Sequence, residues 1–169
     1  MANTNSTLIT NIIADPPVPN DVAVSGGRVR VMADDFEVAG ADFDANDDTI
    51  RLCRLPANAR VLAIYIKNDD MDSGTESAVN IGLAQTDGTI IDEDQFASVS
   101  TQFRAAVIVW TDVTTEALDI ANSFDKLQAH SSDSDETTNP EYEIVMYQTA
   151  TVSSPLAATI AFMVLYTVD

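Results

Sequence analysis

The chain has 169 residues, a length that fits one domain with a hydrophobic core. Hydrophobic residues make up 46% of it and aromatic residues 7%, which favours a folded chain over a disordered one. Lys and Arg number 8 against 27 Asp and Glu, and a surface with this net charge of -19 repels phosphates, so we expect no direct binding to nucleic acid.

The first 27 residues are predicted to form an extended N-terminal arm, followed by a single β-sandwich domain over residues 28–169. The arm is rich in Asn and Thr, has no basic residue and contains Pro16, Pro17 and Pro19, which resist both a helix and a central strand. A frayed terminus is the alternative to an arm that lies across a neighbouring subunit. In the second interpretation the apolar anchors are Leu8, Ile9, Ile12 and Ile13.

Neither end of the chain carries a predicted membrane or export signal. The first residues lack a basic region and a sustained apolar core, so we expect no signal peptide. The most apolar run, residues 156–168, is shorter than the ~20 residues that a membrane-spanning helix needs. We therefore expect a soluble protein with no membrane partner.

The body begins with strand-like segments. Residues 28–38 are β-rich, and Arg28 and Arg30 stand two apart, so they share one face of a strand. They could pair with acids across the sheet, or form a basic patch that docks on an acidic protein. Residues 49–55 and 59–68 are two further strands, joined by a link too short for a helix.

The middle of the chain is predicted to mix strands, a turn and two short helices. Residues 76–85 alternate with period two, as in a half-buried strand, and Asp87-Gly88 follows as a turn. A run of seven apolar or small residues, 105–111, predicts a buried strand in which Trp110 packs in the core; a sugar-binding platform is the alternative. Helical spacing predicts a helix capped by Asp92 and bearing Phe96, Val99 and Phe103, and a second bearing Ala117, Ile120, Ala121, Phe124 and Leu127.

Two strands close the chain, over residues 142–150 and 157–168. The last is apolar on both faces, which is typical of a strand covered on both sides or packed on a partner chain. We assign self-association to one of its faces. Seven or eight strands with one or two short inserted helices predict a mainly β protein, an antiparallel β-sandwich or jelly roll. The assigned residues are Phe162, Val164 and Tyr166.

No catalytic or cofactor motif is present in the sequence. His130 lies beside Ser131-Ser132-Asp133, but adjacency on one loop cannot supply the geometry of a triad. Cys53 stands alone in an apolar run, which favours a buried inert thiol. Asp70 and Asp72 resemble only the start of a calcium loop, so they are weak metal candidates and solvated acids are favoured. We expect no enzyme activity, no metal and no cofactor.

Three segments, in order, resemble accessory virion proteins of tailed bacteriophages. TIRLCRLPANARVLAIYIKND (49–69) is similar to a strand–Leu-Pro–strand element of that family. MDSGTESAVNIGLAQTDGTIIDEDQFAS (71–98) is similar to the element that follows it, with an acidic Ser-Gly-Thr turn and an Asp-Gly turn. NPEYEIVMYQTATVSSPLAATIAFMVLYTVD (139–169) is similar to the closing pair of strands. The arm lies outside this resemblance.

The resemblance implies a β-sandwich of the mature phage particle. Members of that family act as decoration or cement proteins on the capsid surface, commonly as homotrimers bound to the major capsid protein. The alternatives are a head-fibre or tail component, and a module that binds carbohydrate or a host surface. Together with the residue patterns, the resemblance predicts that the chain contacts the capsid through the arm anchors and through the strand face that carries Arg28 and Arg30.

Overall fold

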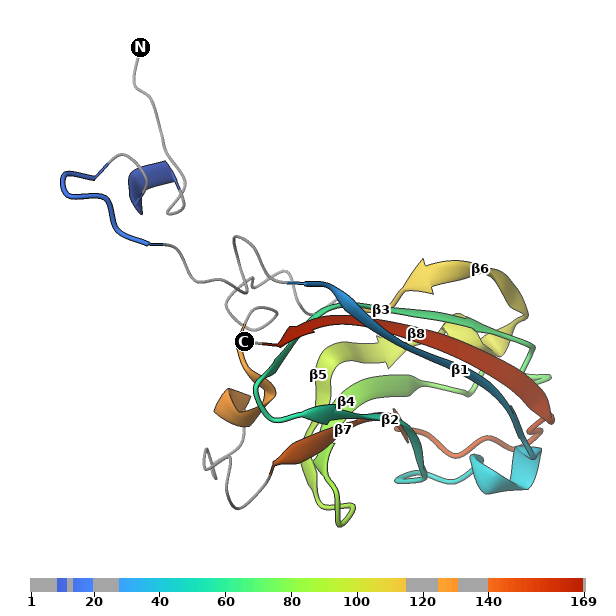
Figure 1. Cartoon of the computed structure of the whole chain (residues 1–169). Helices are drawn as coiled ribbons and strands as arrows, with labels where there is room; N and C mark the ends of the chain where they lie inside the picture. The colour runs from blue at the N-terminus through green and yellow to red at the C-terminus, as the bar shows by residue number, and fades with distance from the viewer. Residues whose placement is uncertain (1–8, 12–13, 20–27, 115–124, 131–139, 169) are drawn as a thin grey trace.

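The computed structural model describes residues 9–11, 14–19, 28–114, 125–130 and 140–168. Its body consists of two antiparallel four-stranded sheets packed face to face, which confirms the predicted sandwich (Figure 1). The upper sheet in Figure 1, sheet A, has the order β1-β8-β3-β6, and the lower sheet, sheet B, has the order β2-β7-β4-β5. The strands are β1 (Arg30–Val38), β2 (Thr49–Pro56), β3 (Ala59–Asn68), β4 (Val79–Gln85), β5 (Ile90–Ser100), β6 (Val107–Asp112), β7 (Glu141–Gln148) and β8 (Ala158–Val168).

The strand order is that of a jelly roll. The antiparallel pairs β1–β8, β2–β7, β3–β6 and β4–β5 are those of one long hairpin, wrapped so that successive pairs fall in alternate sheets. The link at residues 56–58 accordingly carries the chain from β2 in one sheet to β3 in the other. There the Ala57 backbone N–H donates to the Pro140 carbonyl at 2.9 Å.

The core lies between the sheets and is built from inward-facing residues of every strand except β6. In β3, Ile64 and Ile66 are fully buried, and their ladder partners in β8 are Val164 and Phe162. In sheet B, Ile81 and Ile144 fill the facing positions and are also fully buried. Burying one such side chain contributes about 1.5–3 kcal/mol, so the interleaved aliphatic layer is the main source of stability.

The predicted self-association face on the last strand is instead the inner face of β8. Phe162, Val164 and Tyr166 are 3%, 0% and 8% exposed and belong to the chain's own core. Both faces of this strand are apolar in sequence, and the bulkier set fills the space between the sheets. The prediction is therefore wrong in its choice of face, because these side chains are not available to a second copy.

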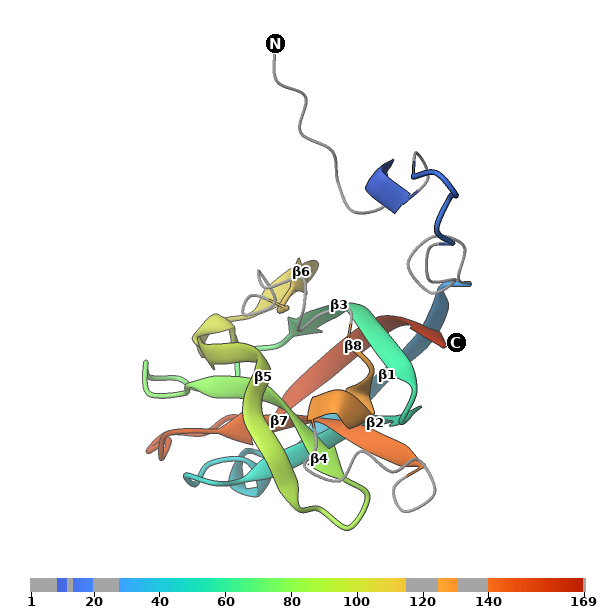
Figure 2. The same cartoon turned by 90° about the vertical axis from the view of Figure 1, so that its left-hand side faces the viewer.

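The helix predicted after Asp92 is replaced by strand β5, which curves strongly (Figure 2). The ladder between β4 and β5 slips at three points, and four residues of β5, 93–96, lie between the partners of Ile81 and Leu83. These bulges break the period of two and place apolar residues at spacings that resemble a helix. Asp92 accepts the Asp94 backbone N–H at 3.2 Å, a contact within the bulge rather than a helix cap.

Most of the second predicted helix lies outside the described residues. Its last member, Leu127, is buried and begins a short 3-10 turn, η3 (Leu127–His130). Two other 3-10 turns, η1 (Gly40–Asp42) and η2 (Gln102–Arg104), complete the helical structure described within the sandwich. The predicted turn at Asp87-Gly88 is confirmed: Gln85 N–H donates to the Thr89 carbonyl at 2.8 Å, and Gly88 has φ +94°.

Candidate interaction surface

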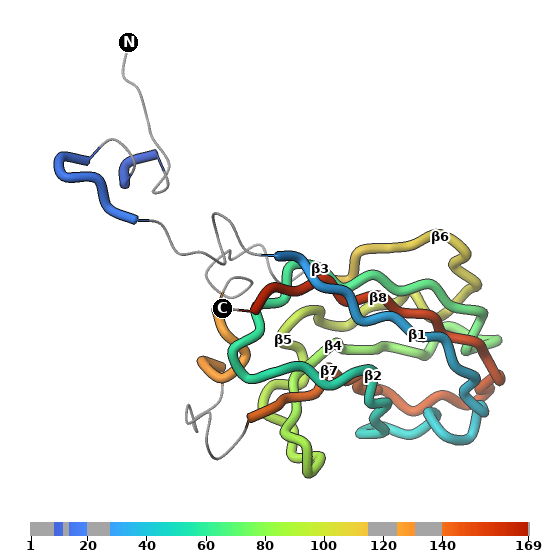
Figure 3. The backbone as a smooth tube through the Cα atoms, in the orientation of Figure 1, coloured from blue at the N-terminus to red at the C-terminus, as the bar shows by residue number. Residues whose placement is uncertain are grey.

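Strand β6 carries three consecutive exposed apolar side chains. Ile108 is 84%, Val109 67% and Trp110 42% exposed, so the strand was predicted correctly but its burial was not. The cause is in the register, since Thr111 pairs with Ile66 and Val107 with Asn68, leaving three residues of β6 opposite the single residue Lys67. The chain arches away from β3 at this edge of sheet A (Figure 3). We call Ile108, Val109 and Trp110 the apolar knob.

Two shallow hollows adjoin the knob on the outer face of sheet A. They share Lys67, Thr159 and Ala161; one, of about 210 Å³, is also lined by Ile108, and the other, of about 500 Å³, by Trp110. The Lys67 ammonium lies 4.8 Å from the centre of the Trp110 ring, a cation–π contact that holds the indole over the sheet. The knob and hollows together form a surface with both raised and recessed apolar parts.

Acidic side chains outnumber basic ones around this surface. Asp34 and Asp35 line the larger hollow and Asp69 lines the smaller one, and all but one of the charged residues that line the two hollows are acidic. The exception is Lys67. Asp112, at the end of β6, is exposed and accepts the Thr114 backbone N–H at 2.9 Å. The apolar knob is therefore set within a negative field.

The residues predicted to contact the capsid lie at the start of the described body and in the arm. Arg28 and Arg30 are both exposed, and neither makes an ion pair with another residue that the structure describes. Ile9 is 46% exposed. The other three predicted anchors, Leu8, Ile12 and Ile13, lie outside the described residues, so their role stays a prediction.

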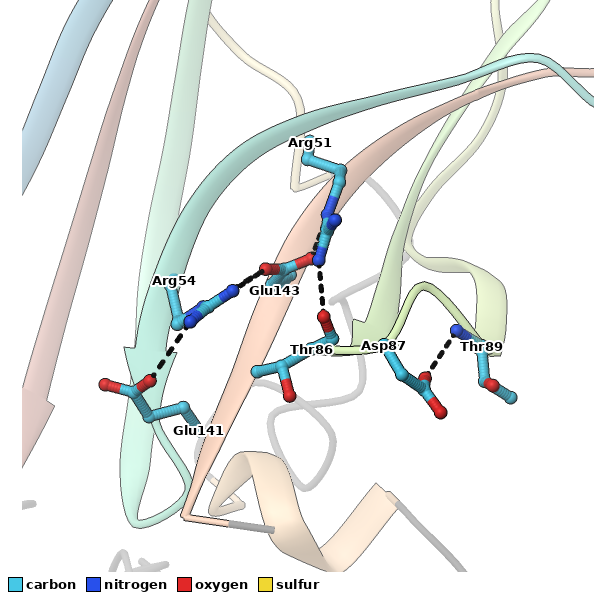
Figure 4. Close-up of polar contacts among 7 residues, drawn as sticks. All are labelled: Arg51, Arg54, Thr86, Asp87, Thr89, Glu141 and Glu143. Carbon is cyan, nitrogen blue, oxygen red and sulfur yellow. Dashed lines mark hydrogen bonds and ion pairs between the residues drawn. The ribbon is translucent and has the colours of Figure 1, made fainter.

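Two other arginines pair with acids across strands, between β2 and β7 (Figure 4). This is one of the two roles that the sequence suggested for Arg28 and Arg30. The Glu143 carboxylate, 4% exposed, accepts hydrogen bonds from Arg51 Nε and from Arg54 Nη2, the latter at 2.7 Å. Arg51 also donates to the Thr86 carbonyl at 2.7 Å. Burial opposes the charge on Glu143, but the two guanidinium groups outweigh it and lower its pKa. This cluster joins the two strands and the β4–β5 turn.

Cys53, Asp70 and Asp72 occupy structural positions in the described part of the chain. Burial, reinforced by the charge on Glu143, raises the pKa of Cys53 to about 12, so its thiol stays protonated at neutral pH. The Asp72 carboxylate, 1% exposed, accepts backbone N–H groups of Gly74, Glu76 and Ser77, and Asp70 accepts that of Asp72 at 3.1 Å. No group of three metal-ligating side chains occurs among the described residues. Asp70 and Asp72 thus brace a loop.

The fold and surface define a class: an acidic jelly roll with an exposed apolar knob at the edge of one sheet. No protein-family model matches the chain, and no curated protein matches its sequence. Solved structures do match. A chain in the capsid asymmetric unit of cyanophage Pam1 aligns over 100% of both chains, with a TM-score of 0.57 and 16% identity. A chain in the capsid of Ralstonia phage GP4 aligns over 90% of each chain, with a TM-score of 0.56 and 20% identity.

At these identities the comparisons establish a shared fold. The fold expected from the resemblance to phage virion proteins is confirmed, since both matched chains come from phage capsids. No described helix of this chain is long and apolar enough to span a membrane.

Proposed function

We propose that this chain is a structural protein of a phage particle, a decoration or cement protein that binds the major capsid protein on the outside of the head. The observation that carries the proposal is the fold match over the full length of a chain from a phage capsid. The sandwich and its acidic surface support a role in binding rather than catalysis. We further propose that it acts as a homotrimer.

The physical role of such a protein is to raise the cost of separating neighbouring capsid subunits. Each contact that spans two subunits must be broken when they part, and buried apolar surface contributes at most about 25 cal/mol per Å². An extended arm reaches up to about 3.3 Å per residue, far enough to cross from one subunit to the next. In this proposal Arg28 and Arg30 add a basic contact where the arm meets the sandwich.

Deleting residues 2–25 is expected to abolish binding to the shell, because the deletion removes every predicted anchor while leaving β1 intact. The measurement is co-sedimentation of the purified protein with particles that lack it. Replacing Leu8, Ile9, Ile12 and Ile13 together by Ser should have the same effect, whereas Val18→Ser, at an arm position that is 50% exposed and not an anchor, should bind normally. Undiminished occupancy by the arm-deleted protein would contradict the role of the arm.

One observation favours a second function, a module that binds carbohydrate or a host surface. Trp110 was expected in the core, and its exposure beside a hollow is what a sugar platform requires. An array of host-surface glycans tests this alternative: binding by the wild-type protein that is lost in Trp110→Ala would support it. A head-fibre or tail part would differ from a cement protein in its low copy number per particle.

A further inference from the structure

We infer that the apolar knob, with the outer face of sheet A beside it, is a docking surface for a basic protein surface that has an apolar pocket. Within the proposed function, on which this inference rests, that partner surface belongs to the shell. The docking surface is distinct from the arm, and the sequence did not predict it.

The exposure of the apolar knob to water is unfavourable. Ile108 and Val109 are more exposed than any other large hydrophobic side chain described in the structure. They stand on an edge strand, where exposed apolar residues promote unwanted pairing unless a partner covers them. The arch of β6 projects these side chains outward instead of folding them back on the sheet, which is the arrangement of an anchor that enters a pocket.

The Trp110 side chain of the knob is partly ordered before a partner binds. Lys67 holds the indole of Trp110 from one side, so part of the ordering cost of this side chain is met before any partner arrives. Tryptophan is enriched among the residues that dominate interface energy, and charged residues are depleted from the centre of interfaces. The knob has this composition, with a Trp and two aliphatic residues at its centre and charges only around it.

The charges around the knob indicate the chemistry of the partner. Asp34, Asp35 and Asp69 line the hollows, opposed only by Lys67, on a chain with a net charge of -19. A second copy that met this surface through the same surface would bring the same acids against these and would be repelled, and so would nucleic acid. Lysine or arginine side chains around an apolar pocket would meet the acidic rim favourably. Charge complementarity therefore favours a basic protein surface over a second copy of this chain.

The test uses the full-length protein and purified shells that lack it. The double variant Ile108→Ala/Trp110→Ala should bind shells about 30-fold more weakly than wild type, the loss typical of an interface anchor. Leu156→Ala is the matched control, since Leu156 is an exposed apolar residue (39%) outside the knob, and it should bind like wild type. Thermal unfolding should be unchanged in both, because the altered side chains are exposed.

A charge variant tests the chemistry of the partner separately. Asp34→Asn/Asp35→Asn should weaken binding several-fold and reduce the loss of affinity between 50 and 200 mM NaCl, because fewer ion pairs then cross the interface. Binding that is unaltered in strength and salt dependence would contradict a basic partner surface.

The outcomes separate this inference from the proposed function. If the wild-type protein fails to bind shells, both fall. If wild type and the knob variant bind shells equally, the inference alone falls. If the knob variant binds shells but its oligomer dissociates in light scattering, the occupant is a second copy. Should it retain shell binding but lose glycan binding, the knob is a sugar platform; either result overturns the inference.

Discussion

Replacing Gly82 by alanine is expected to lower the stability of the sandwich by about 3 kcal/mol, which corresponds to a drop of about 6–12 °C in Tm. Gly82 lies in β4, and β5 crosses directly over it. A methyl group there would stand 2.4 Å from the Asp92 carbonyl oxygen and 2.5 Å from that of Glu93. Both obstacles are backbone atoms, so the whole bulged segment of β5 would have to move. Thermal or denaturant unfolding measures the loss.

The control for Gly82 is Gly88 in the β4–β5 turn. A methyl group at Gly88 meets nothing within 4 Å, so Gly88→Ala faces only the strain of its positive φ, about 1 kcal/mol. The comparison isolates the steric effect from the general cost of replacing a glycine. An unchanged Tm for Gly82→Ala would mean that β5 does not cover β4 as described.

Replacing Asp72 by alanine is the second change with a large expected effect, again about 3 kcal/mol. Its buried carboxylate accepts the backbone N–H groups of Gly74, Glu76 and Ser77 at 2.8, 2.6 and 2.8 Å. Without it, these donors lose their acceptor in a loop that also binds the segment before β8, where Leu156 N–H donates to the Met71 carbonyl at 3.0 Å. Chemical denaturation of this variant beside wild type measures the loss.

The same residue predicts a dependence on pH. Burial opposes the charge on Asp72, but the three backbone N–H donors outweigh it, so its pKa in the folded protein is lowered. Its contribution to stability is therefore complete above the unfolded-state pKa of about 3.9 and is lost as the pH falls through the folded-state pKa. Asp72→Asn should flatten the decline of stability in this acid range. Asp70→Asn, which keeps the oxygen that accepts the Asp72 N–H, is the control; an equal effect would contradict the role of Asp72.

The strands were predictable from sequence wherever the ladder is regular. In β4, whose ladder with β7 is regular, Val79, Ile81 and Leu83 alternate with small or polar residues, and each of the three is fully buried in the core. The residues between and after them, Asn80, Gly82 and Ala84, are buried as well, so the prediction of a half-buried strand was wrong. The turn at Asp87-Gly88 was predictable because it depends on local backbone preference alone. The closing strand β8 was also recognised, although its composition could not show which of its two apolar faces lies inward.

The errors at β5 and β6 arise where bulges break the ladder. A bulge depends on pairing with a distant strand. The local sequence pattern therefore does not predict the register shifts of β5 against β4 or the arch of β6 opposite Lys67. In β6 the run of apolar residues was interpreted as core, and only the partner register shows that three of them leave the sheet. The knob was missed for this reason. The acids that surround it come from β1, from the residue that follows β3 and from the end of β6, and only the fold brings these segments together.

The central claim is that this chain is a high-copy structural component of a phage head, and quantitative mass spectrometry of purified particles tests it most directly. The proposal predicts a copy number comparable with that of the major capsid protein. A few copies per particle would assign the chain to a fibre or tail instead. Its absence from purified particles would contradict the virion role altogether.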